Sequence, residues 1–216
     1  FVFVTSSNLY NKAIKFNKNV SIFSAAVEIE KFNINDNFYL PDEFKLIKNK
    51  KIIGYIGAIT KVLDIDLLNY LISKMKQYTF VFVGRTYVKI DELLQHDNFV
   101  YISEKKHSEI PNFLNFFDTC LIPYKVNDFT NSVYSCKINE YLALGKPIVS
   151  SNMTEIKEFN KKNKDIIYIS KDRDDFLKKI QLSIDENSSD KIDLRVNIAK
   201  SNSWENKFNA INKIID

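Results

Sequence analysis

Two charged residues three positions apart, Lys137 and Glu140, are the clearest candidates for chemistry in this sequence. They fall in a predicted helix over residues 133–144, where residues i and i+3 share a face. A lysine that precedes a glutamate opposes the helix dipole, which is the poorer order for an intrahelical pair. A bound ligand would explain this order, because amides near Ser132 to Tyr134 and the ammonium would hold a diphosphate, while Glu140 would bind a ribose. A solvated ion pair explains the spacing equally well.

Glycine occurs at only four positions, and Gly57 and Gly84 each end an apolar run predicted to be a strand. Gly57 would let the following loop approach the phosphates of a ligand. Tight packing at the end of a strand is an equally good explanation. The third glycine of the dinucleotide fingerprint G-x-G-x-x-G is absent. Gly145 is explained as the left-handed residue that ends the helix over 133–144.

Other residues that often carry chemistry have structural explanations. Asp64 and Asp66 resemble a metal-binding pair, but both fall at the first turn of a predicted helix, where the helix dipole favours carboxylates. No metal site is therefore predicted. The two histidines, His96 and His107, show no pattern of a base with an orienting partner. No catalytic residue is assigned.

The elements that must position these residues alternate between strand and helix. Strands are predicted at 1–6, 20–24, 51–57, 79–84, 98–102, 117–123, 147–151 and 165–170, and helices at 7–17, 63–76, 89–95, 107–116, 133–144, 154–161, 172–186, 191–200 and 203–215. Near-continuous apolar strands alternating with helices are typical of a Rossmann-like α/β fold, a parallel sheet with helices on both faces. In such folds ligands bind beyond the carboxyl ends of the strands.

The composition is that of an ordinary globular protein, with 45% hydrophobic and 27% charged residues among 216. Lysines are scattered along the chain, which does not favour a nucleic-acid-binding stripe. Cys120 and Cys136 form no disulfide framework, so we expect a cytoplasmic protein, with peripheral contact with the inner membrane face left open. The sequence opens on an apolar run, residues 1–6, without methionine or signal peptide, and we expect a fragment.

The stretch over residues 117–150 is the most specific part of the sequence. It contains CLIPY and NDFTNSVYSCKINEYLALGKPIVSS, which resemble a strand, a polar loop and the helix pattern K-x-x-E-Y-x-A-x-G-K-P-V-V of retaining group 1, or family 4, glycosyltransferases. GYIGAI and FVFVG are similar to the first two strands of the same domain. The chain therefore resembles the C-terminal, donor-binding half of a GT-B fold.

The resemblance implies a nucleoside-diphosphate sugar, linked to UDP or GDP, as partner, with no cofactor and no metal. It places the nucleobase at Tyr101 to Ser103, the ribose at Glu140, the diphosphate at Gly57 and Lys137, and the sugar at Asp128 to Ser132. The predicted donor-binding residues are Gly57, Arg85, Tyr101, Ile102, Ser103, Asp128, Thr130, Ser132, Val133, Lys137 and Glu140.

The sequence departs from the family pattern at three positions. Ser132 stands where the family has the first of two paired glutamates, and Ala58 and Asp64 replace an arginine and a lysine that many members use on the diphosphate. Arg85 is the best placed substitute, and Lys137 and Lys61 are further candidates. These departures indicate a divergent branch of the family.

Three segments are expected from the resemblance. Residues 1–32 would be a remnant of the N-terminal domain and the crossing between domains, residues 33–190 the nucleotide-sugar-binding domain, and residues 191–216 the C-terminal helices. The acceptor-binding domain would be mostly missing, so the chain would bind donor but transfer sugar poorly by itself. The alternatives are half of a nucleotide-sugar epimerase, or a non-catalytic module of the same fold used for assembly or membrane association.

Overall fold

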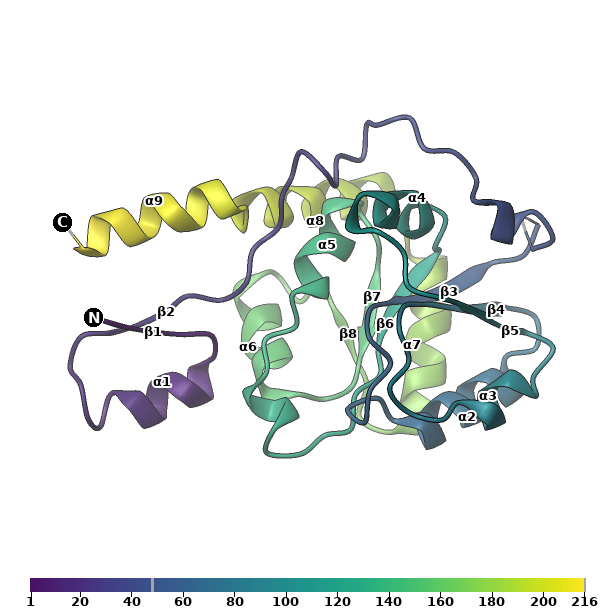
Figure 1. The fold of residues 1–216 in the computed structure, drawn as a ribbon, viewed down its shortest axis with the longest axis horizontal. Coiled ribbons are helices and arrows are strands. Elements are labelled where there is room, and N and C mark those ends of the chain that lie inside the picture. The colour runs from purple at the N-terminus through teal and green to yellow at the C-terminus, as the bar shows by residue number, and fades with distance from the viewer. Residues whose placement is uncertain (48, 216) are drawn as a thin grey trace.

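The computed structural model of the chain describes residues 1–47 and 49–215 (Figure 1). Its strands are β1 (Val2–Val4), β2 (Val20–Ile22), β3 (Ile52–Ile56), β4 (Thr79–Val83), β5 (Phe99–Ile102), β6 (Thr119–Ile122), β7 (Ile148–Ser150) and β8 (Tyr168–Ile169). Its α-helices are α1 (Ser7–Ala13), α2 (Ile65–Lys74), α3 (Asp91–Leu94), α4 (Ile110–Asn115), α5 (Lys137–Ala143), α6 (Thr154–Lys162), α7 (Arg173–Asp185), α8 (Ser189–Ser201) and α9 (Trp204–Ile215). Short 3₁₀ helices occur at η1 (Asp42–Phe44), η2 (His107–Glu109) and η3 (Thr130–Ser132). The alternation predicted from the sequence is confirmed.

The main sheet has six parallel strands in the order β5-β4-β3-β6-β7-β8. Within this sheet β3 comes first along the chain. Strands β4 and β5 follow on one side of it, and β6 then lies on its other side. The strand order reverses between β3 and β6, which pair only at Ile53 with Thr119 and at Gly54 with Cys120. This reversal is the point where α/β sheets bind ligands. The Rossmann-like prediction is confirmed.

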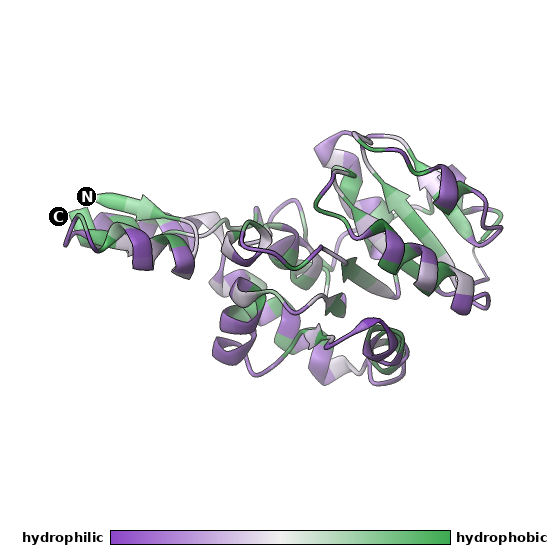
Figure 2. Ribbon diagram, turned by 90° about the horizontal axis from the view of Figure 1, so that it is seen from below, coloured by the Kyte–Doolittle hydropathy of each residue, from purple (hydrophilic) through white to green (hydrophobic). Residues whose placement is uncertain are grey.

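The burial of the strands explains why helices cover both faces of the parallel sheet. Every residue of β3, β4, β6 and β7 is buried, so these strands need a layer of helices on each side. The helices α2 and α7 pack side by side on one face, and α4, α5 and α8 cover the other (Figure 1). Figure 2 shows the resulting pattern, in which hydrophobic strands lie between helices that carry hydrophilic residues.

Two predicted helices differ from the structure in ways that bear on the predicted site residues. The helix predicted over 133–144 begins only at Lys137, because Thr130 to Ser132 form the separate turn η3 and Val133 is extended. The amides of Ser132 to Tyr134 therefore do not start a helix, and their predicted role as helix amides for an anion is wrong. The helix predicted over 107–116 is split between η2 and α4, whose first turn contains Pro111.

A small second unit contains β1, α1 and β2, with the two strands parallel. Helix α9 runs beside this unit (Figure 2). The ring of Phe23 lies 6.1 Å from the Trp204 ring and 6.3 Å from the Phe208 ring, measured between centroids. Within the described part of the chain, no helix is long and apolar enough to cross a membrane. The division at residues 32 and 190 stays a prediction.

Candidate functional site

The carboxyl end of β3 is tied to helix α5 by a buried tyrosine. The amide of Ile56 donates to the Tyr141 hydroxyl at 3.0 Å, and this hydroxyl lies 3.4 Å from the carbonyl of the same residue. Strand β6 has already diverged from β3 at this level, so the tyrosine satisfies backbone groups that the sheet leaves unpaired. The bond ties α5 to the end of β3, and Lys137 in the first turn of the helix lies beside Gly57, the residue that follows β3.

The side chain of Lys137 lies across Gly57. Gly57 has a φ of 132°, and a Cβ added there would collide with Lys137 Cε. Lys137 Nζ donates to the Tyr124 hydroxyl at 3.3 Å and lies 5.4 Å from the centroid of the Tyr55 ring. The structure thus brings together two predicted diphosphate ligands, one from a loop and one from a helix.

The ammonium of Lys137 is held without an anionic partner. In residues 1–47 and 49–215 it forms no ion pair with a carboxylate. Burial acts against the charged form, but the neighbouring Tyr124 and Cys136 outweigh it and the pKa of Lys137 is raised. The residue is therefore a cation near the point where the strand order of the sheet reverses, and aromatic rings rather than an anion surround it.

Glu140 lies one turn further along α5, and its side chain is 22% exposed. Its Oε1 lies 3.5 Å from His107 Nε2, on the 3₁₀ helix η2 that follows β5. Burial raises the pKa of the Glu140 carboxyl, while His107 and Lys137 act in the opposite direction. Sequence reasoning missed His107 because 33 positions separate it from Glu140 and no local pattern joins them.

The residues predicted for the nucleobase end the edge strand of the sheet. Tyr101 is partly exposed, Ile102 is buried and its carbonyl accepts from the Gly84 amide at 3.0 Å, and Ser103 is exposed. The chain continues from Ser103 to His107, so the end of β5 and Glu140 border the same region. Arg85 is exposed after β4, with its guanidinium 5.3 Å from the Tyr87 ring centroid.

The residues predicted for the sugar lie in the loop between β6 and α5. Asp128, Ser132 and Val133 line a cavity of about 560 Å³ between this loop and α1. Ser132 Oγ donates to the Asp128 carbonyl at 3.0 Å and accepts from Asn8 Nδ2 at 3.3 Å. Thr130 is only 1% exposed, and its hydroxyl donates to the Lys125 carbonyl within the loop. Thr130 therefore builds the loop, and its part in donor binding stays a prediction.

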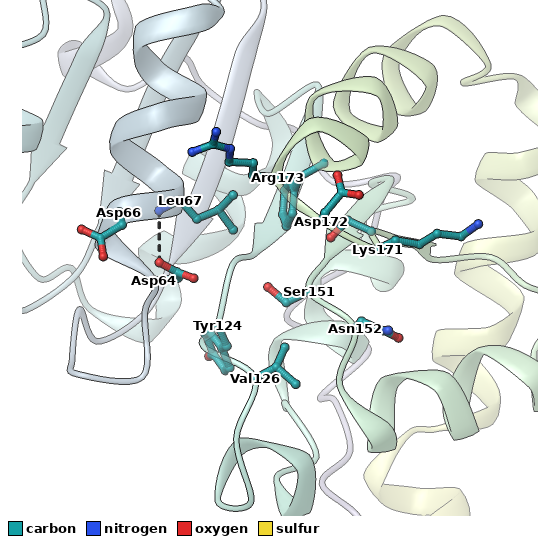
Figure 3. Close-up of a pocket in the computed structure, with 12 residues that line it drawn as sticks. Asp64, Asp66, Leu67, Tyr124, Val126, Ser151, Asn152, Lys171, Asp172 and Arg173 are labelled. Atoms are coloured by element: carbon teal, nitrogen blue, oxygen red, sulfur yellow. Dashed lines mark hydrogen bonds between the residues drawn. The ribbon is translucent and has the colours of Figure 1, made fainter.

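A second cavity, of about 420 Å³, lies at the carboxyl edge between α2 and α7 (Figure 3). Tyr124 and Ser151 line it from the loops that follow β6 and β7, and Arg173 lines it from α7 (Figure 3). Asp64, predicted in the first turn of this helix, is its N-cap and accepts from the Leu67 amide at 3.0 Å. Across residues 1–47 and 49–215, no group of three or more His, Cys, Asp or Glu side chains is arranged to hold a metal ion.

A comparison with known protein families matches the part of the chain that forms the main sheet. The family model of glycosyl transferases group 1 matches residues 50–186, which is more than half of the chain. A Bacillus subtilis (strain 168) protein named as a teichuronic acid biosynthesis glycosyltransferase, TuaH, is 28% identical over 196 residues. That match covers 87% of this chain and 48% of the relative, so the chain spans about half the length of TuaH.

Solved structures share the fold over the whole chain. Sucrose-phosphate synthase from Thermosynechococcus elongatus superposes with a TM-score of 0.76 at 14% identity, covering 99% of this chain and 57% of that one. Anabaena Alr3699/HepE, solved in complex with UDP, superposes with a TM-score of 0.79 at 13% identity, covering 100% of this chain and 63% of that one. At these identities the similarity establishes the fold, which is the C-terminal half of a GT-B arrangement.

Proposed function

The chain belongs to the group 1 glycosyl transferases, and we propose that it binds the nucleoside-diphosphate sugar from which such an enzyme transfers a sugar to an acceptor hydroxyl. One observation carries the proposal: Lys137 lies across the close-approach glycine at the end of β3 without a carboxylate partner in the described residues. A diphosphate supplies the missing anion, and Glu140, one turn along α5, accepts hydrogen bonds from the ribose.

Transfer needs stabilisation of the charge that develops on the departing diphosphate. A fixed, partly buried ammonium is suited to this, because the lysine is already positioned by Tyr124 and Tyr55 before the reaction begins. We assign this role to Lys137. The loop over residues 128–133 then faces the sugar, since it borders the cavity against α1.

The acceptor belongs, in this proposal, to a further domain, and surface polysaccharide is the proposed product. The relative TuaH, named for teichuronic acid biosynthesis, supports this product class. The chain by itself would bind donor and transfer sugar poorly. We propose a cytoplasmic location, with the acceptor presented at the inner membrane face.

A non-catalytic module of the same fold is the second candidate. The observation that favours it is the side chain of Ser132, a short hydroxyl bonded to Asn8 and Asp128 where the family pattern has a glutamate. Such a module would retain the fold without donor binding. Half of a nucleotide-sugar epimerase would bind UDP as well, and differs only in the reaction of the complete protein.

The test is titration calorimetry of the chain with UDP and with GDP, repeated on Lys137→Ala and Glu140→Ala. We expect micromolar to millimolar binding of one nucleotide, weakened on the order of tenfold or more by each substitution. Lys178→Ala, an exposed lysine of α7, is the matched control and should leave affinity unchanged. Absence of binding by the folded wild-type chain would favour the non-catalytic module.

A further inference from the structure

His107 connects three parts of the molecule that the sequence keeps apart. Its Nε2 lies 3.5 Å from Glu140 Oε1 on α5, and its ring meets the edge of the Phe32 ring with centroids 5.5 Å apart. Phe32 is 1% exposed and belongs to the segment that leads from β2 to the main sheet. The imidazole is thus fixed on one side by a buried aromatic ring and faces a carboxylate on the other.

We propose that His107 is a positioning residue for nucleotide binding, which holds the Glu140 carboxylate ionised and in one orientation. The inference rests on the proposed contact between Glu140 and the ribose. His107 does not touch the nucleotide in this scheme and acts through the carboxylate.

The charged groups around the pair determine the direction of the effect. Glu140 faces His107 and, on its own helix, Lys137, while His107 also faces Glu28 on the segment from β2. Lys31 already pairs with Glu28 and holds the pKa of that carboxyl below its ordinary value. Lys137, the other cation that acts on Glu140, donates its hydrogen bond to Tyr124, so the side-chain contact of the Glu140 carboxylate is with His107.

The direction in which His107 shifts the pH dependence of nucleotide binding follows from these neighbours. Burial raises the pKa of the Glu140 carboxyl, and the His107 charge works against that rise. Without the imidazole, Glu140 takes up a proton at a higher pH. A protonated carboxyl is a poorer acceptor for two ribose hydroxyls, so nucleotide affinity is lost earlier as the solution is acidified.

The experiment is titration of the full chain with UDP from pH 5 to pH 8, for wild type and His107→Gln. We expect the pH at which affinity is half lost to rise by roughly half a unit, since His107 is half exposed and its charge is screened. His107→Lys, which restores a cation, should return the midpoint toward the wild-type value. His96→Gln is the matched control, because His96 contacts Asn69 and Lys76 instead. Titration of the UDP phosphate is common to all curves, so only differences between variants are compared.

Four outcomes would overturn the proposal. A uniform loss of affinity with an unchanged midpoint would reduce His107 to a packing residue on Phe32. A midpoint shift that persists in a Glu140→Gln background would show that His107 acts on another group. Unchanged UDP affinity in Glu140→Gln alone would remove the ribose contact, and with it both this inference and the assignment on which it rests. Loss of UDP binding in Glu140→Gln, together with an unmoved His107→Gln midpoint, would overturn this inference alone.

Discussion

The Lys137 side chain crosses the backbone of Gly57 so closely that a Cβ at Gly57 would lie 2.8 Å from Lys137 Nζ. The φ of 132° at Gly57 is also one that residues with a Cβ rarely adopt. The glycine is therefore required by its own backbone, and a Cβ there would also displace the end of the lysine side chain. The loop after β3 and the first turn of α5 form a single structural unit at this point.

Replacement of Gly57 by alanine should damage both folding and nucleotide binding. The strained backbone should cost more than about 1 kcal/mol of unfolding free energy, and the displaced lysine should lower UDP affinity on the order of tenfold. Gly145→Ala is the control, since Gly145 has a φ of 66° and its Cβ would lie 2.7 Å from Ile192 Cγ2, away from Lys137. It should lower stability and keep UDP affinity. Equal losses of affinity in both variants would contradict a local role of Gly57.

Replacement of Tyr141 by phenylalanine should loosen α5 from the end of β3. The fully buried hydroxyl is bonded to the Ile56 backbone, so its removal leaves buried polar groups unsatisfied at a cost of about 1–3 kcal/mol. Denaturant unfolding should show this loss, and the thermal midpoint should fall by about 2–4 °C per kcal/mol. Tyr39→Phe, at a 62% exposed position, should change neither. An unchanged Tyr141→Phe midpoint would mean that packing alone holds α5.

Glu140→Gln should stabilise the fold near neutral pH while it weakens UDP binding. Burial raises the pKa of this carboxyl in the folded chain above its unfolded value, so its ionisation disfavours folding. That cost is fully present above the folded pKa and disappears as the pH falls below the unfolded value. The gain in unfolding free energy should therefore be seen at pH 7 and be absent in acid. A gain that is independent of pH would point to packing of the amide instead.

Asn8→Ala should release the loop over residues 128–133 from α1. Asn8 Nδ2 donates to the Asn131 carbonyl at 3.1 Å and to Ser132 Oγ, while its amide donates to Glu155 Oε1 at 3.2 Å. Loss of the side-chain bonds, worth about 1 kcal/mol each, should speed hydrogen exchange in the loop but not in β3. Asn11→Ala, an exposed residue of the same small unit, is the control. Equal rates of hydrogen exchange in the loop of the two variants would show that the Asn8 side chain does not hold the loop against α1.

The sequence by itself determined the class of fold, because apolar runs and helical periods are local properties. Continuous apolar runs such as Phe80 to Val83 require burial on both faces, and the helices between them supply the cover. Lys137 and Glu140 were identified by their type and spacing, and the resemblance over residues 117–150 indicated the family that the comparison shows. Asp64 was placed at the start of a helix for the same local reason, and the structure makes it the N-cap of α2.

The tertiary structure alone decided which residues meet. The strand order β5-β4-β3-β6-β7-β8, which brings the ends of β3 and β6 together, depends on crossovers whose direction no local pattern records. The start of α5 at Lys137 was set by the loop that Thr130 closes with its buried hydroxyl, against the helical pattern upstream. The contact between His107 and Glu140 joins residues 33 positions apart. Contacts of this kind arise from packing of the whole sheet and its helices, so sequence spacing could not predict them.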